Sequence, residues 1–365
     1  MESLEDMLLT RRQMLRGLGM AALTVGASSV LLACGSQGAV TSTPTPTPTK
    51  PPKPRPGAPT TLVRTVLYNT GPAYGIAYSH DGKNLATAGL DKNVRVWDAI
   101  NGGLALFTLS ALVDAALSVT YSPDGKRVAA GAIQPFVDIW DASQNKDQST
   151  ALITLTGQKD RINSVDWSPD GNHLASASDD HTVMIWDASK QGNPIVTLQD
   201  DNEQIAVAWS PDNKRVASGC ANKTAKIWDA VQGGKPLQTL SEHTDRVRSV
   251  SWSPDGAKLL TGSDDHTLKV WDANNGGKSL MTLTGHTARV SSVSWSQDGK
   301  YLASGSDDGS VKLWDANAGG AALVTLTPND AVNEFVQDIA WSPDTQAIAA
   351  SYGDGRVWIW EFVQV

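Results

Sequence analysis

Short runs of alternating hydrophobic and polar residues, separated by turn-forming residues, fill the chain from about residue 62 onwards. The stretch from Gly285 to Asp315 shows the unit: VSSVSW, KYLASGS and SVKLW alternate with period two, and QDGK and DDGS separate them. A fourth run, LVTLT, follows the Trp-Asp pair. This pattern predicts four short antiparallel strands in each unit.

The unit occurs seven times. An aromatic-acid pair marks each copy, at spacings of 43, 46, 42, 43, 43 and 46 residues: Trp97-Asp98, Trp140-Asp141, Trp186-Asp187, Trp228-Asp229, Trp271-Asp272, Trp314-Asp315 and Trp360-Glu361. A period of this length indicates one supersecondary unit copied in series. Because a lone four-stranded sheet would leave both of its faces wet, we expect the copies to pack face to face around an axis.

The Trp-Asp pairs and the SPDG turns closely resemble those of the WD-repeat family of β-propellers, over roughly residues 62 to 365. The resemblance implies an all-β, seven-bladed β-propeller of four-stranded antiparallel sheets, here over residues 61–365. The last copy has only five residues after Trp360, so it lacks one strand. The segment Leu62 to Asn69 aligns with Leu280 to His286, and we expect it to close the last blade as an N-terminal strand.

Residues 1–33 are typical of an export signal. The run TRRQMLR, Thr10 to Arg16, resembles a twin-arginine motif, although the pattern does not separate twin-arginine from general secretory export. An apolar run then ends in LLAC, which resembles a bacterial lipobox and predicts cleavage before Cys34 and lipidation of its thiol. The expected location is the outer face of the cytoplasmic membrane. The alternative is an uncleaved N-terminal helix in which the cysteine occurs by chance.

Residues 34–60 are rich in threonine and proline, a composition that favours extended polyproline II structure and cannot build a core. This predicts a linker between lipid and propeller. The whole chain has a net charge of −8, and the three basic residues of the linker leave about −11 on the propeller. Because nucleic-acid binding needs a basic footprint, this charge argues against general nucleic-acid binding.

Histidine, hydroxyl and carboxylate side chains recur together, which could suggest a nucleophilic triad. The family resemblance instead assigns them to a buried structural hydrogen-bond chain, and their repetition from copy to copy favours that interpretation. The second copy, with Ala130 and Gln134, lacks the chain. Two copies are complete: His243, Thr261, Asp265 and Trp271 in the fifth, and His286, Ser304, Asp308 and Trp314 in the sixth.

The sequence contains no recognisable metal or phosphate-binding motif, so no cofactor and no metal are expected. Carboxylates gather in the turns between the second and third strands, where solvated turns are the simpler interpretation. Cys220 lies in a strand pattern, and we expect a buried thiol without a disulfide partner.

In WD-repeat propellers, a bulge in the first strand of each blade aims side chains onto one face, the top face. By alignment, two groups of candidate partner-binding residues lie there. The seventh, first and second copies form an apolar arc, and other copies supply arginines: Pro72, Tyr74, Leu117 and Phe335, then Arg161, Arg246, Arg248 and Arg289. Such a surface suits a protein or peptide with an apolar anchor and one or two carboxylates. The alternative is that copies beside the seam have drifted and that their own loops cover these side chains.

The function expected from these features is a monomeric, non-enzymatic scaffold that is lipid-anchored outside the cytoplasm and binds a protein or peptide on its top face. The alternative is a propeller enzyme or sensor that binds a small ligand or a metal in the central channel. An enzyme should place several non-repeating polar residues at the mouth of the channel, whereas most polar positions here repeat.

Overall fold

The computed structural model describes residues 60–328 and 334–363 of the 365-residue chain. The expected signal, Cys34 and nearly all of the expected linker lie outside the described residues, so the structure does not test them.

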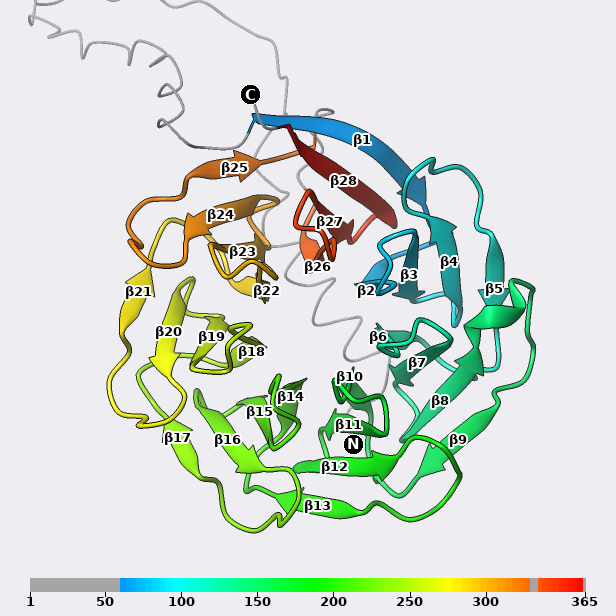
Figure 1. Cartoon of the computed structure of the whole chain (residues 1–365), viewed down its shortest axis with the longest axis horizontal. Coiled ribbons are helices and arrows are strands. Elements are labelled where there is room, and N and C mark those ends of the chain that lie inside the picture. Colours follow the sequence, from blue (N-terminus) through cyan, green and yellow to red (C-terminus); the bar gives the residue numbers. More distant parts are fainter. Residues whose placement is uncertain (1–59, 329–333, 364–365) are drawn as a thin grey trace, which may run out of the picture. The chain divides into compact units, whose positions relative to one another are not determined.

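Seven four-stranded antiparallel sheets stand around a central axis (Figure 1). We number them as blades 1 to 7 in chain order and letter their strands a to d from the axis outwards. Blades 1 to 3 consist of β2 (Ala73–Tyr78), β3 (Asn84–Gly89), β4 (Val94–Asp98) and β5 (Phe107–Leu109); β6 (Ala116–Tyr121), β7 (Arg127–Ala132), β8 (Phe136–Asp141) and β9 (Ile153–Thr156); and β10 (Ile162–Trp167), β11 (His173–Ser178), β12 (Thr182–Asp187) and β13 (Val196–Gln199).

Blades 4 to 6 repeat the arrangement. They consist of β14 (Gln204–Trp209), β15 (Arg215–Cys220), β16 (Ala225–Asp229) and β17 (Gln238–Leu240); β18 (Val247–Trp252), β19 (Lys258–Ser263), β20 (Leu268–Asp272) and β21 (Met281–Leu283); and β22 (Val290–Trp295), β23 (Tyr301–Ser306), β24 (Val311–Asp315) and β25 (Val324–Leu326). A single 3-10 turn, η1 (Ala142–Gln144), is the one helical element of the described residues. The all-β propeller predicted from the repeats is therefore confirmed.

Blade 7 joins the two ends of the propeller. Its inner strands are β26 (Val336–Trp341), β27 (Ala347–Tyr352) and β28 (Arg356–Val363), and its outer strand is β1 (Thr60–Tyr68). β1 pairs antiparallel with β28, from Thr60 opposite Val363 to Tyr68 opposite Arg356. The number of strands counted in the sequence predicts this position, the outer strand of the last blade, for the N-terminal segment. Strand a of blade 1 also contacts strand a of blades 2 and 7, so the ring is continuous.

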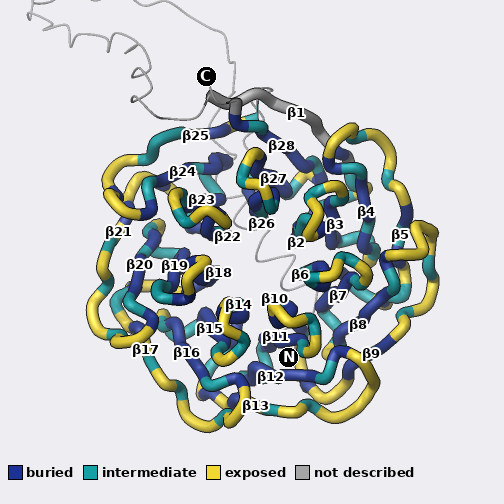
Figure 2. The backbone as a smooth tube through the Cα atoms, viewed as in Figure 1, coloured by how far each residue is buried: buried dark blue, intermediate teal, exposed yellow. Residues whose placement is uncertain are grey.

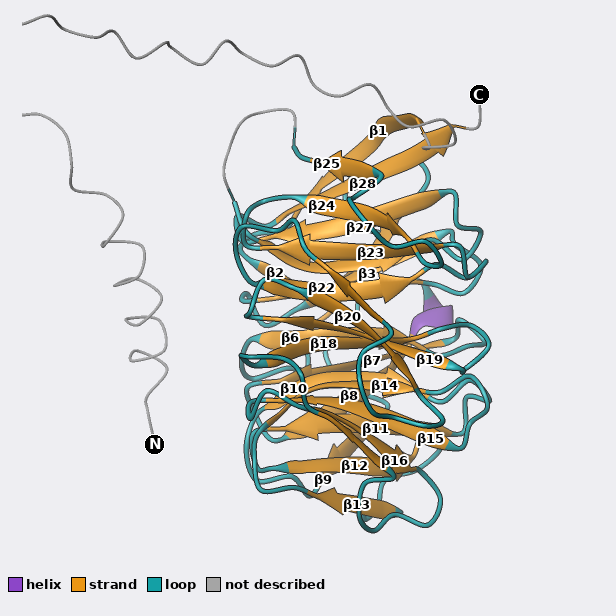
Figure 3. Ribbon diagram, turned by 90° about the vertical axis from the view of Figure 1, so that its left-hand side faces the viewer, coloured by secondary structure: helices purple, strands orange, loops and turns teal. Residues whose placement is uncertain are grey.

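The up-and-down course of the strands gives the disc two faces, seen edge-on in Figure 3. The top face carries the turns between strands b and c and the connections from one blade to the next. The bottom face carries the turns between strands a and b and the loops between strands c and d, and it faces the viewer in Figure 1. Every strand a has a register shift directly after its first residue, which is the bulge that the family resemblance implies.

The hydrophobic core lies between adjacent blades, where side chains of neighbouring sheets pack together. Figure 2 shows that the buried positions follow the strands and that most exposed positions lie in the loops. The tryptophan of the Trp-acid pair is 0 or 1 % exposed in blades 2 to 6. Close packing also selects glycine: a Cβ atom added to Gly305 would lie 2.5 Å from Cγ1 of Val336 in the next blade. Since cores pack at near-crystalline density, the blades keep a fixed spacing and the faces of the disc are rigid.

Candidate functional site

The recurring polar side chains of blades 5 and 6 form buried chains of hydrogen bonds. In blade 6 the Trp314 indole donates to Ser304 Oγ at 2.9 Å, Ser304 Oγ lies 2.7 Å from His286 Nε2, and His286 Nδ1 lies 2.8 Å from an oxygen of Asp308. An indole only donates, so the hydroxyl donates onward to Nε2 and the Nδ1 proton goes to the carboxylate. The Ser304 and His286 side chains thus have all their polar atoms engaged.

Blade 5 repeats the chain from Trp271 through Thr261 and His243 to Asp265, with distances of 2.9, 2.7 and 2.8 Å. Burial alone would raise the pKa of Asp265, but hydrogen bonds from His243, Thr267 and the Thr244 N–H outweigh it and hold the pKa well below its usual range. A carboxylate so placed is a fixed acceptor. A hydroxyl that is shared between an indole and an imidazole cannot act as an exposed nucleophile.

Other blades keep shorter versions with different residues. Asn69 takes the place of the histidine in blade 1 and accepts from Thr87 at 2.9 Å, and Gln158 does so in blade 3, accepting from Ser176 at 2.7 Å. Blade 2 has lost the chain, as its sequence predicts. Within the described residues, the indole nitrogen of Trp140 there has no hydrogen-bond partner.

Blade 4 holds a buried ion pair that sequence reasoning missed. Lys226 on β16 bonds to Asp200, and their side chains are only 11 and 4 % exposed. The Gln204 amide donates to the same carboxylate at 2.9 Å, and the Cys220 thiol donates to it at 3.5 Å. Burial raises the pKa of Cys220 to about 11, so the thiol stays protonated. The only sequence signal was a lysine at a strand c position, which blades 5 and 6 also have as the half-buried Lys269 and Lys312.

Most of the predicted top-face arginines are already paired within the chain. Arg161, Arg248 and Arg289 bind Asp179, Asp264 and Asp307 of the adjacent turns, at 2.6, 2.8 and 2.6 Å. Sequence reasoning treated the arginines and these turn carboxylates as separate groups.

Arg246 differs from the other three arginines. Its side chain is exposed, and the described part of the chain brings no carboxylate into ion-pair contact with it. Of the basic set, Arg246 is therefore the one most accessible to a partner.

The predicted apolar arc is present but half-buried. Pro72, Tyr74, Leu117 and Phe335 each have intermediate exposure, at the inner rim of the adjacent blades 7, 1 and 2. The structure adds Val113, which is 70 % exposed in the connection from blade 1 to blade 2. The alignment missed it because this position lies in a connection and not in strand a.

Side chains of strand a link several neighbouring blades around the central channel. Asp338 accepts the Ser292 hydroxyl of blade 6 at 2.7 Å and the Ile76 N–H of blade 1 at 3.0 Å, while Asp166 accepts the Trp209 N–H of blade 4 at 2.8 Å. Burial raises the pKa of Asp166 to about 7 and that of Asp338 to about 6. These carboxylates therefore join the inner strands of neighbouring sheets through hydrogen bonds.

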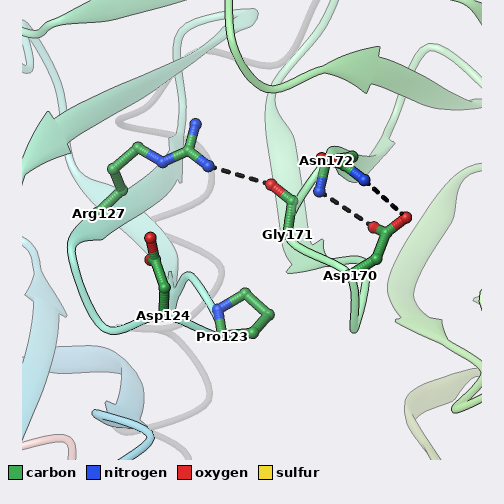
Figure 4. Close-up of a pocket in the computed structure, with 6 residues that line it drawn as sticks. All are labelled: Pro123, Asp124, Arg127, Asp170, Gly171 and Asn172. Carbon is green, nitrogen blue, oxygen red and sulfur yellow. Dashed lines mark hydrogen bonds between the residues drawn. The ribbon is translucent and has the colours of Figure 1, made fainter.

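An open depression of about 420 Å³ lies on the bottom face between blades 2 and 3 (Figure 4). Its one cation, Arg127, donates to the backbone oxygens of Gly171 at 3.0 Å and Ala188 at 2.6 Å, and it stacks 4.6 Å above the Trp167 ring. Arg215 makes the same contacts in blade 4, on Gly256, Ala273 and Trp252. The depression is therefore lined by a clamp between blades, not by free ligand-binding groups.

Among residues 60–328 and 334–363, no three His, Cys, Asp or Glu side chains converge as a metal site. Over the same residues, no helix has the length and apolarity needed to cross a bilayer.

Comparison with known families follows the blades. A model of the WD domain, G-beta repeat, matches residues 61–98, 149–187, 192–229, 234–272, 277–315 and 323–361, which is more than half of the chain. The chain belongs to the WD-repeat family. The stretch between the first two matched segments, residues 99–148, contains the inner three strands of blade 2, where the hydrogen-bond chain is lost. Curated proteins provide no match to this WD-repeat protein.

Proposed function

We propose that this WD-repeat protein is a scaffold that binds a protein or peptide partner on the top face of its propeller, without catalysis. The observation that carries the proposal is an arc of partly accessible apolar side chains on the top face, formed by Phe335, Tyr74, Leu117 and Val113. The exposed Arg246 lies elsewhere on the same face. Propellers of this family commonly serve as protein-interaction scaffolds. An apolar anchor with a carboxylate is the partner chemistry that complements such a face.

The recurring hydroxyls and imidazoles support a role without catalysis, because each is engaged inside a blade. The alternative function is an enzyme or sensor that binds its ligand in the central channel, and two carboxylates on the strands that line the channel, Asp166 and Asp338, could serve it. Both accept backbone N–H groups of the next blade, which favours an architectural role.

We further propose that the scaffold is held at the outer face of the cytoplasmic membrane by a lipid on Cys34. The support is the order of charged, apolar and small residues before that cysteine. Diacylation supplies two chains, which is enough for stable anchoring. Metabolic labelling with an alkyne fatty acid tests this: the wild type should take up label, and Cys34→Ser should not. Equal labelling of the two would refute the anchor.

Partner binding is tested by crosslinking in intact cells. A photo-reactive residue at position 74 should capture a discrete partner, and Phe335→Ala with Arg246→Glu should lower its yield by about tenfold or more, the loss typical of an interface hot spot. Val231→Ala, an exposed apolar change on the bottom face, is the matched control. Equal yields from the wild type and the top-face variant would reject the site.

A further inference from the structure

The propeller's polypeptide leaves the disc at the bottom face. Thr60, the first residue of β1, pairs with Val363 at the end of β28, and β28 runs from the top face to the bottom face. The residues that connect the propeller to Cys34 are therefore joined to the bottom edge of blade 7. At about 3.1 Å per residue, a tether of this length allows the bottom face to reach a bilayer without requiring it.

Exposed aliphatic side chains gather on this same face. Nine large hydrophobic residues are exposed among the described residues, and eight of them lie in loops between strands c and d. Five of the eight precede strand d at equivalent positions, 50 to 59 % exposed: Leu106, Leu152, Ile195, Leu237 and Leu280. Leu104 of blade 1 stands apart, because it is 92 % exposed and Ile100 of the same loop is 45 % exposed.

Loops of the same backbone shape allow a direct comparison. Blades 1, 4, 5 and 6 each carry two successive glycines with positive φ between strands c and d, at residues 102–103, 233–234, 276–277 and 319–320. The residue after this pair is Leu104 in blade 1, Lys235 in blade 4, Lys278 in blade 5 and Ala321 in blade 6. The same position is thus apolar on the two blades that flank blade 7, and cationic farther around the ring.

Charge follows the same division. The loops of blades 1 and 6, residues 99–106 and 316–323, contain no charged residue, whereas the corresponding loops of blades 2 to 5 contain Lys146, Lys190, Lys235 and Lys278. The uncharged loops of blades 1 and 6, which we call the rim, flank the point where the chain leaves the propeller, and Leu104 is the exposed leucine after the glycine pair. The charged side chains of these two blades on the same face, Lys83 and Lys300 among them, lie in the turns between strands a and b. Exposed apolar patches that are bordered by polar residues mark interaction sites.

We propose that this rim is a membrane-docking surface, on which Leu104 and Ile100 of blade 1 enter the bilayer beside the tether. The occupant is a lipid surface of low charge, because the loops offer aliphatic side chains and no cation for anionic headgroups. The inference rests on the proposed anchor at Cys34, which holds the rim at a high effective concentration near lipid, so that weak insertion suffices. Docking by this sector tilts the disc and leaves the top face accessible.

The test uses the full-length chain, reconstituted in phosphatidylcholine vesicles and labelled with an environment-sensitive fluorophore through Leu104→Cys. Val231→Cys is the matched control, since residue 231 occupies the position of Ile100 in the loop of blade 4 and is 71 % exposed. The wild type carried through the same labelling gives the background, which comes from any chain whose Cys34 lacks the lipid, because Cys220 is buried. We expect a blue shift and a several-fold loss of iodide quenching at position 104 on vesicles, and neither at position 231.

Each other outcome overturns the proposal in a recognisable way. If the chain floats with vesicles but positions 104 and 231 stay equally quenchable, the anchor stands and docking fails. If the chain does not float, the anchor and docking both fail. Shielding of position 104 without vesicles, or only after a protein extract is added, assigns the rim to a protein contact.

Discussion

Removal of the Ser304 hydroxyl tests the hydrogen-bond chain of blade 6. The side chain is 0 % exposed and lies between the Trp314 indole and the His286 imidazole, at 2.9 and 2.7 Å. Ser304→Ala leaves a buried donor and a buried acceptor without their partner. Each unsatisfied group costs about 1 to 3 kcal/mol, so the expected loss of unfolding free energy is about 3 kcal/mol.

Thermal unfolding of the full chain, followed by circular dichroism, measures this loss. For a domain of about 300 residues, 1 kcal/mol corresponds to about 2 °C, so Ser304→Ala should lower Tm by about 6 °C. Blade 2 supplies the reverse change, because Trp140 is 0 % exposed and its indole nitrogen lacks a partner within the described residues. Ala130→Ser offers that nitrogen an acceptor and should raise Tm by about 2 °C.

The two variants together separate hydrogen bonding from packing. If Ser304→Ala melts within about 1 °C of the wild type, the indole and imidazole find other partners and the chain is not a stabilising device. If both variants lower Tm, the volume at this position matters more than the hydroxyl.

Three further predictions concern stability. The pKa values of Asp166 and Asp338 lie above the ordinary 3.8 in the folded protein, so the free energy of unfolding should fall as pH rises from about 4 to 7. Urea titrations at pH 5 and pH 8 measure this fall, which should be smaller in Asp166→Asn and Asp338→Asn than in the wild type. An unchanged difference between the two pH values would contradict the assignment. Lys226→Ala should cost about 3 to 5 kcal/mol in the same titrations by leaving the Asp200 charge buried and unpaired, and a loss below about 1 kcal/mol would mean that water replaces the lysine. Deletion of residues 60–69 should expose the edge of β28 and yield aggregates by light scattering; a monomer with unchanged melting would be the opposite result.

The strand pattern carried most of the fold. Runs of alternating residues, SPDG turns and Trp-acid pairs each indicate a local geometry, and their sevenfold repetition predicts seven similar sheets around an axis. The family resemblance then implied the closed propeller. Even the weak second copy was visible, because Ala130 cannot accept a hydrogen bond from Trp140. The bulge in strand a came from family resemblance and not from any local signal.

The surface was less predictable, since pairing between turns depends on distances that no spacing encodes. Arg161, Arg248 and Arg289 looked available until the structure placed a turn carboxylate beside each of them. The ion pair between Asp200 and Lys226 joins a connection to strand c, two segments with no shared motif.

The antiparallel pairing of β1 with β28 has a mechanical consequence. If the bottom face is tethered and the top face grips a partner, a pull between them acts along β1, and its hydrogen bonds to β28 share the load in shear instead of opening one by one. The disc would then transmit tension through its seam as a stiff link, and the first element to yield under force would be the strand that seals the ring.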